Sequence, residues 1–146
     1  MFTESVKAIG NLEVKLLDSI GVLKDIRNVN NLVVAVGKDV IASRLAGNTT
    51  ALPSYMALGS SNTAAITSQT TLGTELGRVA LDSTTRTSNT IAYVATFGAG
   101  TGTGALTEAG IFNAVTSGNM LCRTVFSTVT KAAGDTVVIT WNVTIA

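Results

Sequence analysis

The sequence contains no histidine, a single cysteine, Cys122, and a single proline, Pro53. Without histidine, the chain lacks the commonest general base of enzymes and the commonest metal ligand. One cysteine cannot form a disulfide within the chain, so we interpret Cys122 as a small apolar residue. Only a lysine could then activate a serine or threonine nucleophile, and no lysine lies near a distinctive serine motif. We therefore predict that the chain is not an enzyme and has no catalytic residues.

Charged residues are also scarce. They make up 13% of the 146 residues, about half the usual ~25%. The net charge of +1 does not favour binding to nucleic acid or to an anionic membrane. Six basic and five acidic side chains fall within residues 1–47, so residues 48–146 contain an even lower share of charged residues. Uncharged polar surfaces cost less to desolvate, which suits assembly with copies of the chain or with other proteins. A monomer with a threonine-rich β surface is the alternative.

Long apolar runs are missing as well. No run approaches the ~18 residues of a membrane span, and the first residues, MFTESVKAIG, lack the pattern of a signal peptide. No Asp- or Asn-rich stretch has the spacing of a calcium loop. We therefore expect a soluble chain made in a cytoplasm, with no metal and no cofactor. The length suits one domain, residues 1–146.

What the chain does contain is a series of short strand patterns. Residues 12–16 alternate between apolar and charged side chains, DSIG supplies a turn, and a second strand starts near Val22, which predicts a hairpin. We assign Trp141 to the core, because the last strand pattern places it on an apolar face with Val137, Ile139, Val143 and Ile145. Further strands are predicted in NNLVVAVG, YMALG, RVALDSTTRT, TIAYVATF, EAGIFNA and NMLCRTVFSTV.

Helical periodicity is limited to short stretches. Residues 38–46 predict a short helix, with Gly47 in the left-handed position just past its end. TTLGTELG, residues 70–77, predicts at most one helical turn, and residues 60–69 predict a polar loop. The fold class is therefore mainly β: an antiparallel β-sandwich or barrel-like domain with one short helix insertion. Residues 1–47 form an N-terminal hairpin, strand and helix, and residues 48–146 form the antiparallel β core.

A glycine-rich stretch, FGAGTGTGALTEAG at residues 97–110, contains the pattern of a dinucleotide-binding loop in Gly100, Gly102 and Ala105. Such a loop needs a helix directly after the glycines and an acidic residue about 20 positions on. Here the sequence returns to a strand pattern, and residues 120–124 contain no acid. No phosphate-binding G-K-[ST] motif is present either. We interpret the glycines as an architectural turn with positive φ at several positions.

Five charged residues need a role. Glu75 and Arg78 predict a structural, partly buried ion pair at a strand entrance, and the two would be neighbours if the segment forms a helical turn. A catalytic acid with an anion clamp is the alternative. Glu108, a lone carboxylate beside an apolar strand, is expected to accept backbone N–H bonds and fix the glycine loop. Asp82 and Asp135 occur in turn or strand-edge contexts and are expected to be solvated.

The order of several motifs resembles small bacteriophage virion structural proteins related to the N-terminal attachment domain of tail-collar fibre proteins. An ALG turn is followed by a Leu-x-x-Glu-x-x-Arg segment (Leu72, Glu75, Arg78), a strand, the sequence EAGIF from Glu108, and two closing strands joined at a lysine turn. The quoted pieces are YMALGSSNTAA, TTLGTELGRVAL, TIAYVATF, GALTEAGIFNA and GNMLCRTVFSTVTKAAGDTVVITWNVTI. The resemblance starts near residue 12.

The resemblance implies a virion structural protein of the tail or baseplate-fibre region, made in the host cytoplasm. It would bind other virion proteins and form a homo-oligomer, with a trimer favoured, and would bind neither nucleic acid nor membrane. No shaft or collagen-like repeat lies within the 146 residues, which keeps open a place on the head as a capsid decoration (cement) protein. A receptor- or carbohydrate-binding β module ranks lower, because the few aromatic residues fall mostly on apolar faces. Residues 60–69 and 98–106 become candidate contact loops.

Overall fold

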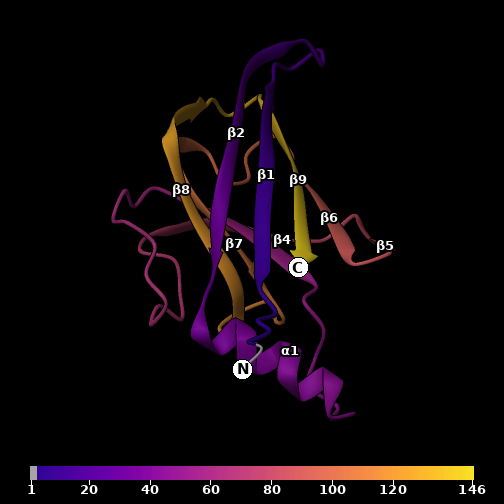
Figure 1. Ribbon diagram of the computed structural model, residues 1–146. Helices are drawn as coiled ribbons and strands as arrows, with labels where there is room; N and C mark the ends of the chain where they lie inside the picture. Colours follow the sequence, from indigo (N-terminus) through magenta and orange to yellow (C-terminus); the bar gives the residue numbers. More distant parts are fainter. Residues whose placement is uncertain (1–2) are drawn as a thin grey trace.

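The computed structural model describes residues 3–146, in which nine strands and one helix form (Figure 1). The fold is mainly β, and the strands build a curled antiparallel sheet of the barrel or sandwich kind, as predicted. The elements are β1 (Ala8–Leu17), β2 (Leu23–Val33), α1 (Ala35–Leu45), β3 (Tyr55–Gly59), β4 (Glu75–Ala80), β5 (Ser83–Thr87), β6 (Thr90–Phe97), β7 (Gly104–Phe112), β8 (Met120–Lys131) and β9 (Thr136–Ile145).

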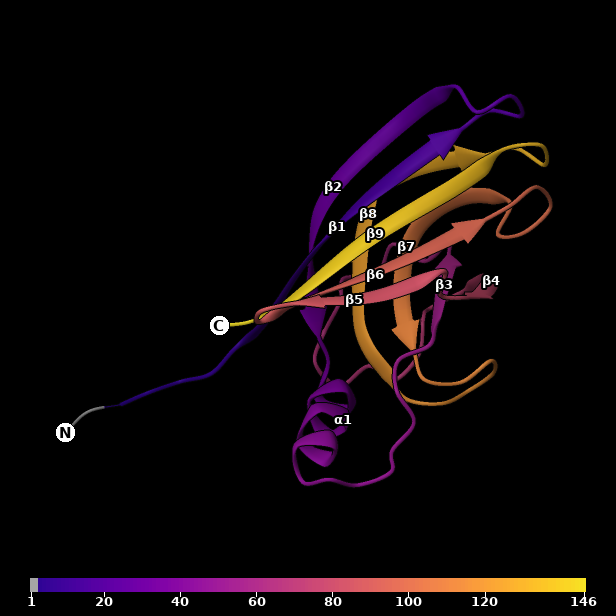
Figure 2. The same cartoon turned by 90° about the vertical axis from the view of Figure 1, so that its right-hand side faces the viewer.

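The sheet has the strand order β4-β3-β7-β8-β2-β1-β9-β6-β5. It folds over at β2, which pairs with β1 along the hairpin but with β8 through Leu32 and Val33. Two facing halves result, with β1, β9, β6 and β5 on one side and β8, β7, β3 and β4 on the other (Figure 2). On the side away from β2, strands β4 and β6 lie in contact.

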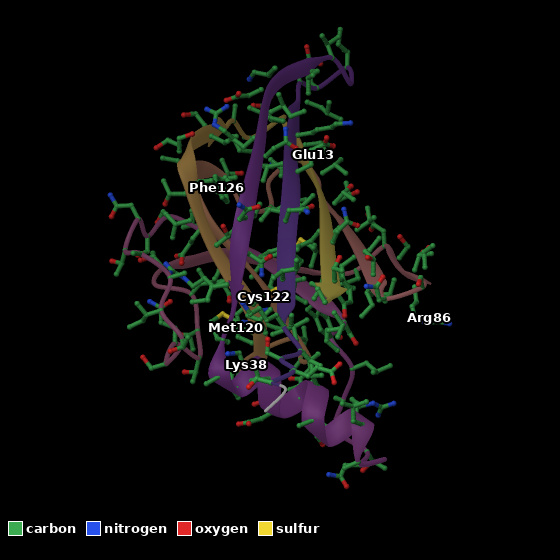
Figure 3. All side chains as sticks on the ribbon, viewed as in Figure 1. Glu13, Lys38, Arg86, Met120, Cys122 and Phe126 are labelled. Atoms are coloured by element: carbon green, nitrogen blue, oxygen red, sulfur yellow. The ribbon has the colours of Figure 1, made fainter. Side chains whose placement is uncertain are left out.

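The core fills the space between the two halves. Alternate residues of β9 are buried, among them Ile139 and Trp141, as their spacing predicts. Cys122 is a free, buried thiol inside the body (Figure 3), and burial raises its pKa well above the ordinary value. Its interpretation as a small apolar residue is confirmed. The largest apolar side chains with almost no exposure are Trp141, Phe97, Phe112, Leu12, Met56, Leu58, Leu106, Ile111, Met120 and Ile139.

Helix α1 begins three residues before the predicted start, and the preceding strand ends at Val33. Gly37 makes this early start possible, because a Cβ atom there would sit 2.0 Å from the carbonyl oxygen of Leu121. Glycine therefore lets the first turn of the helix lie directly against β8. Past the end of the helix, Gly47 has a φ of +78°, as predicted.

The helical turn predicted for residues 70–77 is wrong. Residues from Glu75 onwards form the edge strand β4, which pairs with β3. Gly59 lies opposite Glu75 and Leu58 opposite Gly77, so Leu76 is an extra residue, a β-bulge. Pairing with β3 overrides the weak local helical preference, which Gly73 and Gly77 already reduce.

One end of the sheet, called the turn end here, gathers three turns: residues 18–22, 98–103 and 132–135 (Figure 2). Gly100 N–H donates to the carbonyl of Ala133 at 2.8 Å, and Lys24 Nζ lies 2.8 Å from Asp135 Oδ2. Asp135 also accepts the Ala132 N–H at 2.9 Å and is buried. The expectation that Asp135 is solvated is therefore wrong, because its buried carboxylate ties the turn at residues 132–135 to the start of β2.

The opposite end, called the helix end, carries α1. The start of β1 and the end of β9 meet there, because Ala8 lies opposite Ile145 in the antiparallel pair. Figure 1 shows α1 below the strands and the β1–β2 turn above them. The two ends of the β1–β2 hairpin therefore mark the two ends of the molecule.

Candidate functional site

A buried ion pair lies on the two neighbouring strands β7 and β8. Arg123 Nη2 and Nε donate to Glu108 Oε2 at 2.8 and 3.0 Å. Both side chains are completely buried. The register of β7 and β8 explains their closeness, since Gly110 lies opposite Arg123 and Glu108 is two residues away along β7.

The ion pair holds the loop between β3 and β4, residues 60–74, at both ends. Glu108 accepts the N–H groups of Ser61, Gly73 and Thr74 at 3.1, 2.9 and 2.7 Å. Arg123 Nη1 donates to the Thr63 carbonyl at 2.9 Å and to Gln69 Oε1 at 3.0 Å. Glu108 thus accepts backbone N–H bonds as expected. The loop it fixes is residues 60–74, so its assignment to the glycine loop is wrong.

The environment of Glu108 stabilises its ionised form. Burial by itself raises the pKa of this carboxyl group. The N–H donors of Thr74, Gly73 and Ser61, together with Arg123, outweigh burial, so the pKa lies below its ordinary value. The carboxylate is therefore a fixed anion that organises the loop, with its oxygens occupied by donors from the protein.

Arg123 is the member of this centre that the sequence reasoning missed. The only signal was a basic residue inside the apolar run MLCRTVF. A buried arginine is rare unless it is paired, so this position needed a carboxylate partner on a neighbouring strand. Identifying Glu108 as that partner required the pairing of β7 with β8.

Glu75 and Arg78 form the ion pair expected, with Arg78 Nη2 2.6 Å from Glu75 Oε1. Residues three apart in a regular strand point to opposite faces, but the bulge at Leu76 returns both side chains to one face. The Arg78 side chain is 9% exposed and that of Glu75 is 37% exposed, so the arginine is partly buried and the glutamate is exposed.

Arg78 makes most of its contacts with the connection between β7 and β8. Its Nη1 donates to the carbonyls of Ala114 and Ser117 at 2.8 and 2.9 Å. Its guanidinium carbon lies 3.7 Å from the centre of the Phe112 ring, a cation–π contact. Arg78 therefore fixes a turn at the helix end, and Glu75 is one of several partners.

The glycine loop adopts the backbone expected of an architectural turn. Gly100, Gly102 and Gly104 have φ values of +78°, +62° and +127°. Strand β7 follows the loop directly, so the helix N-terminus that a dinucleotide site uses is not found there. Lys131, which is buried, donates to the Gly98 carbonyl at 2.9 Å and anchors the start of the loop.

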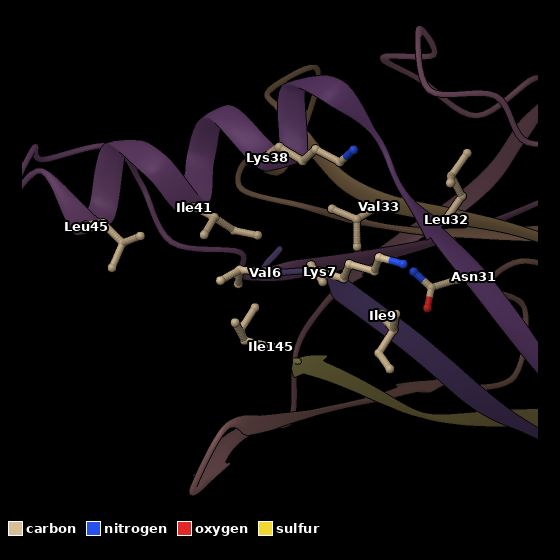
Figure 4. A pocket seen from close by; sticks show the side chains of 11 residues that line it. Val6, Lys7, Ile9, Asn31, Leu32, Val33, Lys38, Ile41, Leu45 and Ile145 are labelled. Carbon is tan, nitrogen blue, oxygen red and sulfur yellow. The ribbon is translucent and has the colours of Figure 1, made fainter. Parts of the chain in front are cut away.

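An apolar groove lies at the helix end, between α1 and the strand ends (Figure 4). Its cavity volume is about 610 Å³. Ile41 and Leu45 of α1 separate it from a second hollow of about 440 Å³. The groove is lined by Val6, Lys7, Ala8, Ile9, Asn31, Leu32, Val33, Lys38, Ile41, Leu45 and Ile145.

The remaining acidic residue considered as a candidate, Asp82, is exposed and accepts a hydrogen bond from Thr96 at 2.7 Å. Within residues 3–146, no group of three or more His, Cys, Asp or Glu side chains is placed to hold a metal ion. None of the helical segments in this range has the length and apolar character needed to cross a membrane.

Comparisons with protein-family models, with curated proteins and with solved structures find no match to this chain. The structure itself presents three candidate functional features. They are a polar loop pinned by a buried ion pair, a rigid cluster of turns at one end, and an apolar groove at the other.

Proposed function

We propose that the chain is a structural protein of a bacteriophage particle: a non-enzymatic assembly module of the tail or baseplate-fibre region that binds other virion proteins. The order of the sequence motifs supports the viral assignment. Support for a binding role comes from the structure of the loops. The viral assignment and the binding role both concern contacts between proteins, and neither requires a bound cofactor.

The observation that carries the binding role is the buried pair of Glu108 and Arg123 beneath residues 60–74. Burying two charges costs free energy that is recovered only when every hydrogen bond is made. Here the bonds go to the two ends of a surface loop, so the pair sets the shape of that loop. A loop held in one conformation loses little freedom when a partner binds it, which favours affinity.

The uncharged character of the surface supports the same role. Strand β5, at one edge of the sheet, exposes all five of its residues, and four of them are Ser or Thr. Arg86 is the single charged residue of this strand and projects at the periphery (Figure 3). An exposed edge strand of this kind can pair with a strand of a neighbouring protein.

A capsid decoration protein on the head surface is the second candidate. It would use the same pinned loop and uncharged edges, and it differs in where the partners lie. A carbohydrate-binding module is less well supported, because such modules stack sugars on exposed aromatic rings. Among residues 3–146 every aromatic side chain is buried or half-buried.

The test is cryo-electron microscopy of the purified phage particles, with mass spectrometry to establish that they contain the chain. Density that fits the curled sheet in the tail or baseplate-fibre region supports the proposal. Density on the head surface favours the decoration protein instead. Particles that lack the chain altogether would overturn both assignments.

A further inference from the structure

The β1–β2 turn presents an apolar tip at the turn end of the molecule. Ile20 is 82% exposed, and Val22 and Leu23 are exposed by half or more. The turn is held rigid, since Asp18 Oδ1 accepts the N–H groups of Ile20 and Val22, both at 2.9 Å. Exposed aliphatic residues grouped at one tip are typical of a contact surface.

The hairpin behind this tip projects beyond the rest of the sheet (Figure 1). Strand β2 pairs with β8 at Leu32 and Val33, and from there the two strands separate towards the turn. Arg27 bridges the gap by donating to Ser127 Oγ at 2.7 Å and to the Thr128 carbonyl at 3.1 Å. The tip therefore projects from the sheet, and the hairpin that carries it is held to β8 by Arg27.

The apolar groove lies at the opposite end of the same hairpin. Leu45 is 85% exposed, and Val6 and Ile9 are also exposed along the groove (Figure 4). The ten residues of β1 separate the two sites, a distance of about 33 Å at the rise of a strand. One molecule thus cannot place its own tip in its own groove.

The charges of the two sites are complementary. Lys7 and Lys38 line the groove, and no acidic side chain lines it within the part of the chain described. At the tip, Lys24 is paired with Asp135 and Arg27 with Asp25. Asp18 is left as the tip's unbalanced charge, since no basic side chain in residues 3–146 forms an ion pair with it.

We propose that the β1–β2 tip of one copy packs into the apolar groove of a second copy, so that copies associate head to tail. Each copy then offers one tip and one groove, and a head-to-tail contact between two copies leaves one tip and one groove open. Repetition produces a ring if the rotation between copies closes, and a filament if it does not. This inference rests on the proposed function, because it names the partner of an assembly module as another copy of the same chain.

The test uses two variants that each damage one site. Ile20→Asp alters the tip, and Leu45→Asp alters the groove. Both residues are exposed, so neither change should disturb the core. Val6→Asp is a second groove variant outside the helix, and Val115→Asp, at an exposed position that does not line the groove, is the control. Dissociation constants are measured by sedimentation velocity, with melting curves to check that each variant folds.

The wild type and Val115→Asp should associate, while each site variant should raise the dissociation constant at least about tenfold. An equimolar mixture of Ile20→Asp and Leu45→Asp, each largely monomeric alone, should give a dimer that grows no further. In that dimer, the intact tip of one variant meets the intact groove of the other. An interface of tip against tip, or of groove against groove, predicts no such rescue.

The inference is overturned if the wild type stays a monomer of 14.9 kDa. It is also overturned if Ile20→Asp associates as the wild type does, or if the mixture shows no dimer. None of these results decides the proposed function, which depends on finding the chain in phage particles. Particles without the chain would remove the proposed function and leave the measured self-association intact.

Discussion

Arg123 donates two hydrogen bonds to the same oxygen of Glu108, at 3.0 Å from Nε and 2.8 Å from Nη2, and neither side chain reaches solvent. The other oxygen, Oε1, accepts the N–H groups of Ser61 and Thr74. Oε2 also accepts the Gly73 N–H, so one carboxylate joins two strands of the sheet and both ends of a surface loop. This arrangement makes the pair a structural element with a measurable contribution to stability.

Replacing Arg123 with methionine should lower the free energy of unfolding by about 3–5 kcal/mol, because it leaves the Glu108 carboxylate buried without its cation. Urea unfolding measures the change. The exposed pair of Glu13 and Lys15, 3.2 Å apart, supplies the control, and Lys15→Met should cost less than about 1 kcal/mol. Equal effects at the two sites would contradict the larger contribution expected of the buried pair.

The two members of the other ion pair should differ in their effects. Arg78→Ala removes two carbonyl bonds and the contact with Phe112, and hydrogen bonds to charged groups contribute about 1.5–3 kcal/mol each. Glu75→Ala removes a partner that is over a third exposed, which should cost less than about 1 kcal/mol. Thermal melting separates them, with Arg86→Ala on the exposed strand β5 as the control. Matching losses for both residues would contradict this asymmetry.

Acid should destabilise the protein through Glu108 and Asp135. The hydrogen bonds from Lys24 and from the Ala132 N–H lower the pKa of Asp135, and that of Glu108 is also lowered. The unfolded chain therefore binds more protons than the folded chain in this range. The stabilisation is complete above the ordinary carboxyl pKa of about 4 and is lost as pH falls through the lower folded values.

Unfolding experiments between pH 6 and pH 2 test this expectation. A Glu108→Gln, Asp135→Asn double variant should be less stable at pH 6 and should lose less stability on acidification than the wild type. If the two proteins lose the same amount, other carboxyl groups cause the acid sensitivity.

Gly37→Ala should destabilise the protein, although alanine is the better helix former. The new Cβ would lie 2.0 Å from the backbone oxygen of Leu121, which cannot move without distorting β8. Overpacking of this kind typically costs about 1–3 kcal/mol. Gly98→Ala is the matched control, because a Cβ there meets nothing within 4 Å and should leave the melting temperature nearly unchanged.

The glycine loop should bind no nucleotide. Isothermal titration with NAD, ATP and GTP is expected to give no heat of binding, because strand β7 follows the loop where a phosphate site would require a helix. A micromolar dissociation constant for any of the three would mean that residues 98–104 have a binding role.

Much of the fold could be predicted because it depends on local periodicity. The alternation of apolar and polar residues along β9 identifies its buried face without any knowledge of the neighbouring strands. Gly47, with its positive φ, marks the end of α1. The start of α1 could not be predicted, because it depends on the contact of Gly37 with a strand more than 80 residues further along the chain.

The contacts of the charged residues show more clearly what the sequence alone could not predict. Glu108 could be identified as a carboxylate that binds backbone N–H groups, but its loop partners lie 34 to 47 residues away in the sequence. Asp135 was expected to be solvated because its turn sequence gives no sign of Lys24, which lies 111 residues earlier. The bulge at Leu76 appears only through the register of β4 with β3.

The place of β9 in the sheet has a consequence for how the protein is made. This strand lies between β1 and β6, so one side of β1, the first strand in the sequence, pairs with β9, the last. During synthesis, the β1–β2 hairpin and the β7–β8 pair can form early from nearby residues. One flank of β1 and one flank of β6 stay unpaired until residues 136–145 leave the ribosome. Because such long-range pairings form slowly, the nascent chain passes through a stage with two open strand edges, when it is most exposed to aggregation.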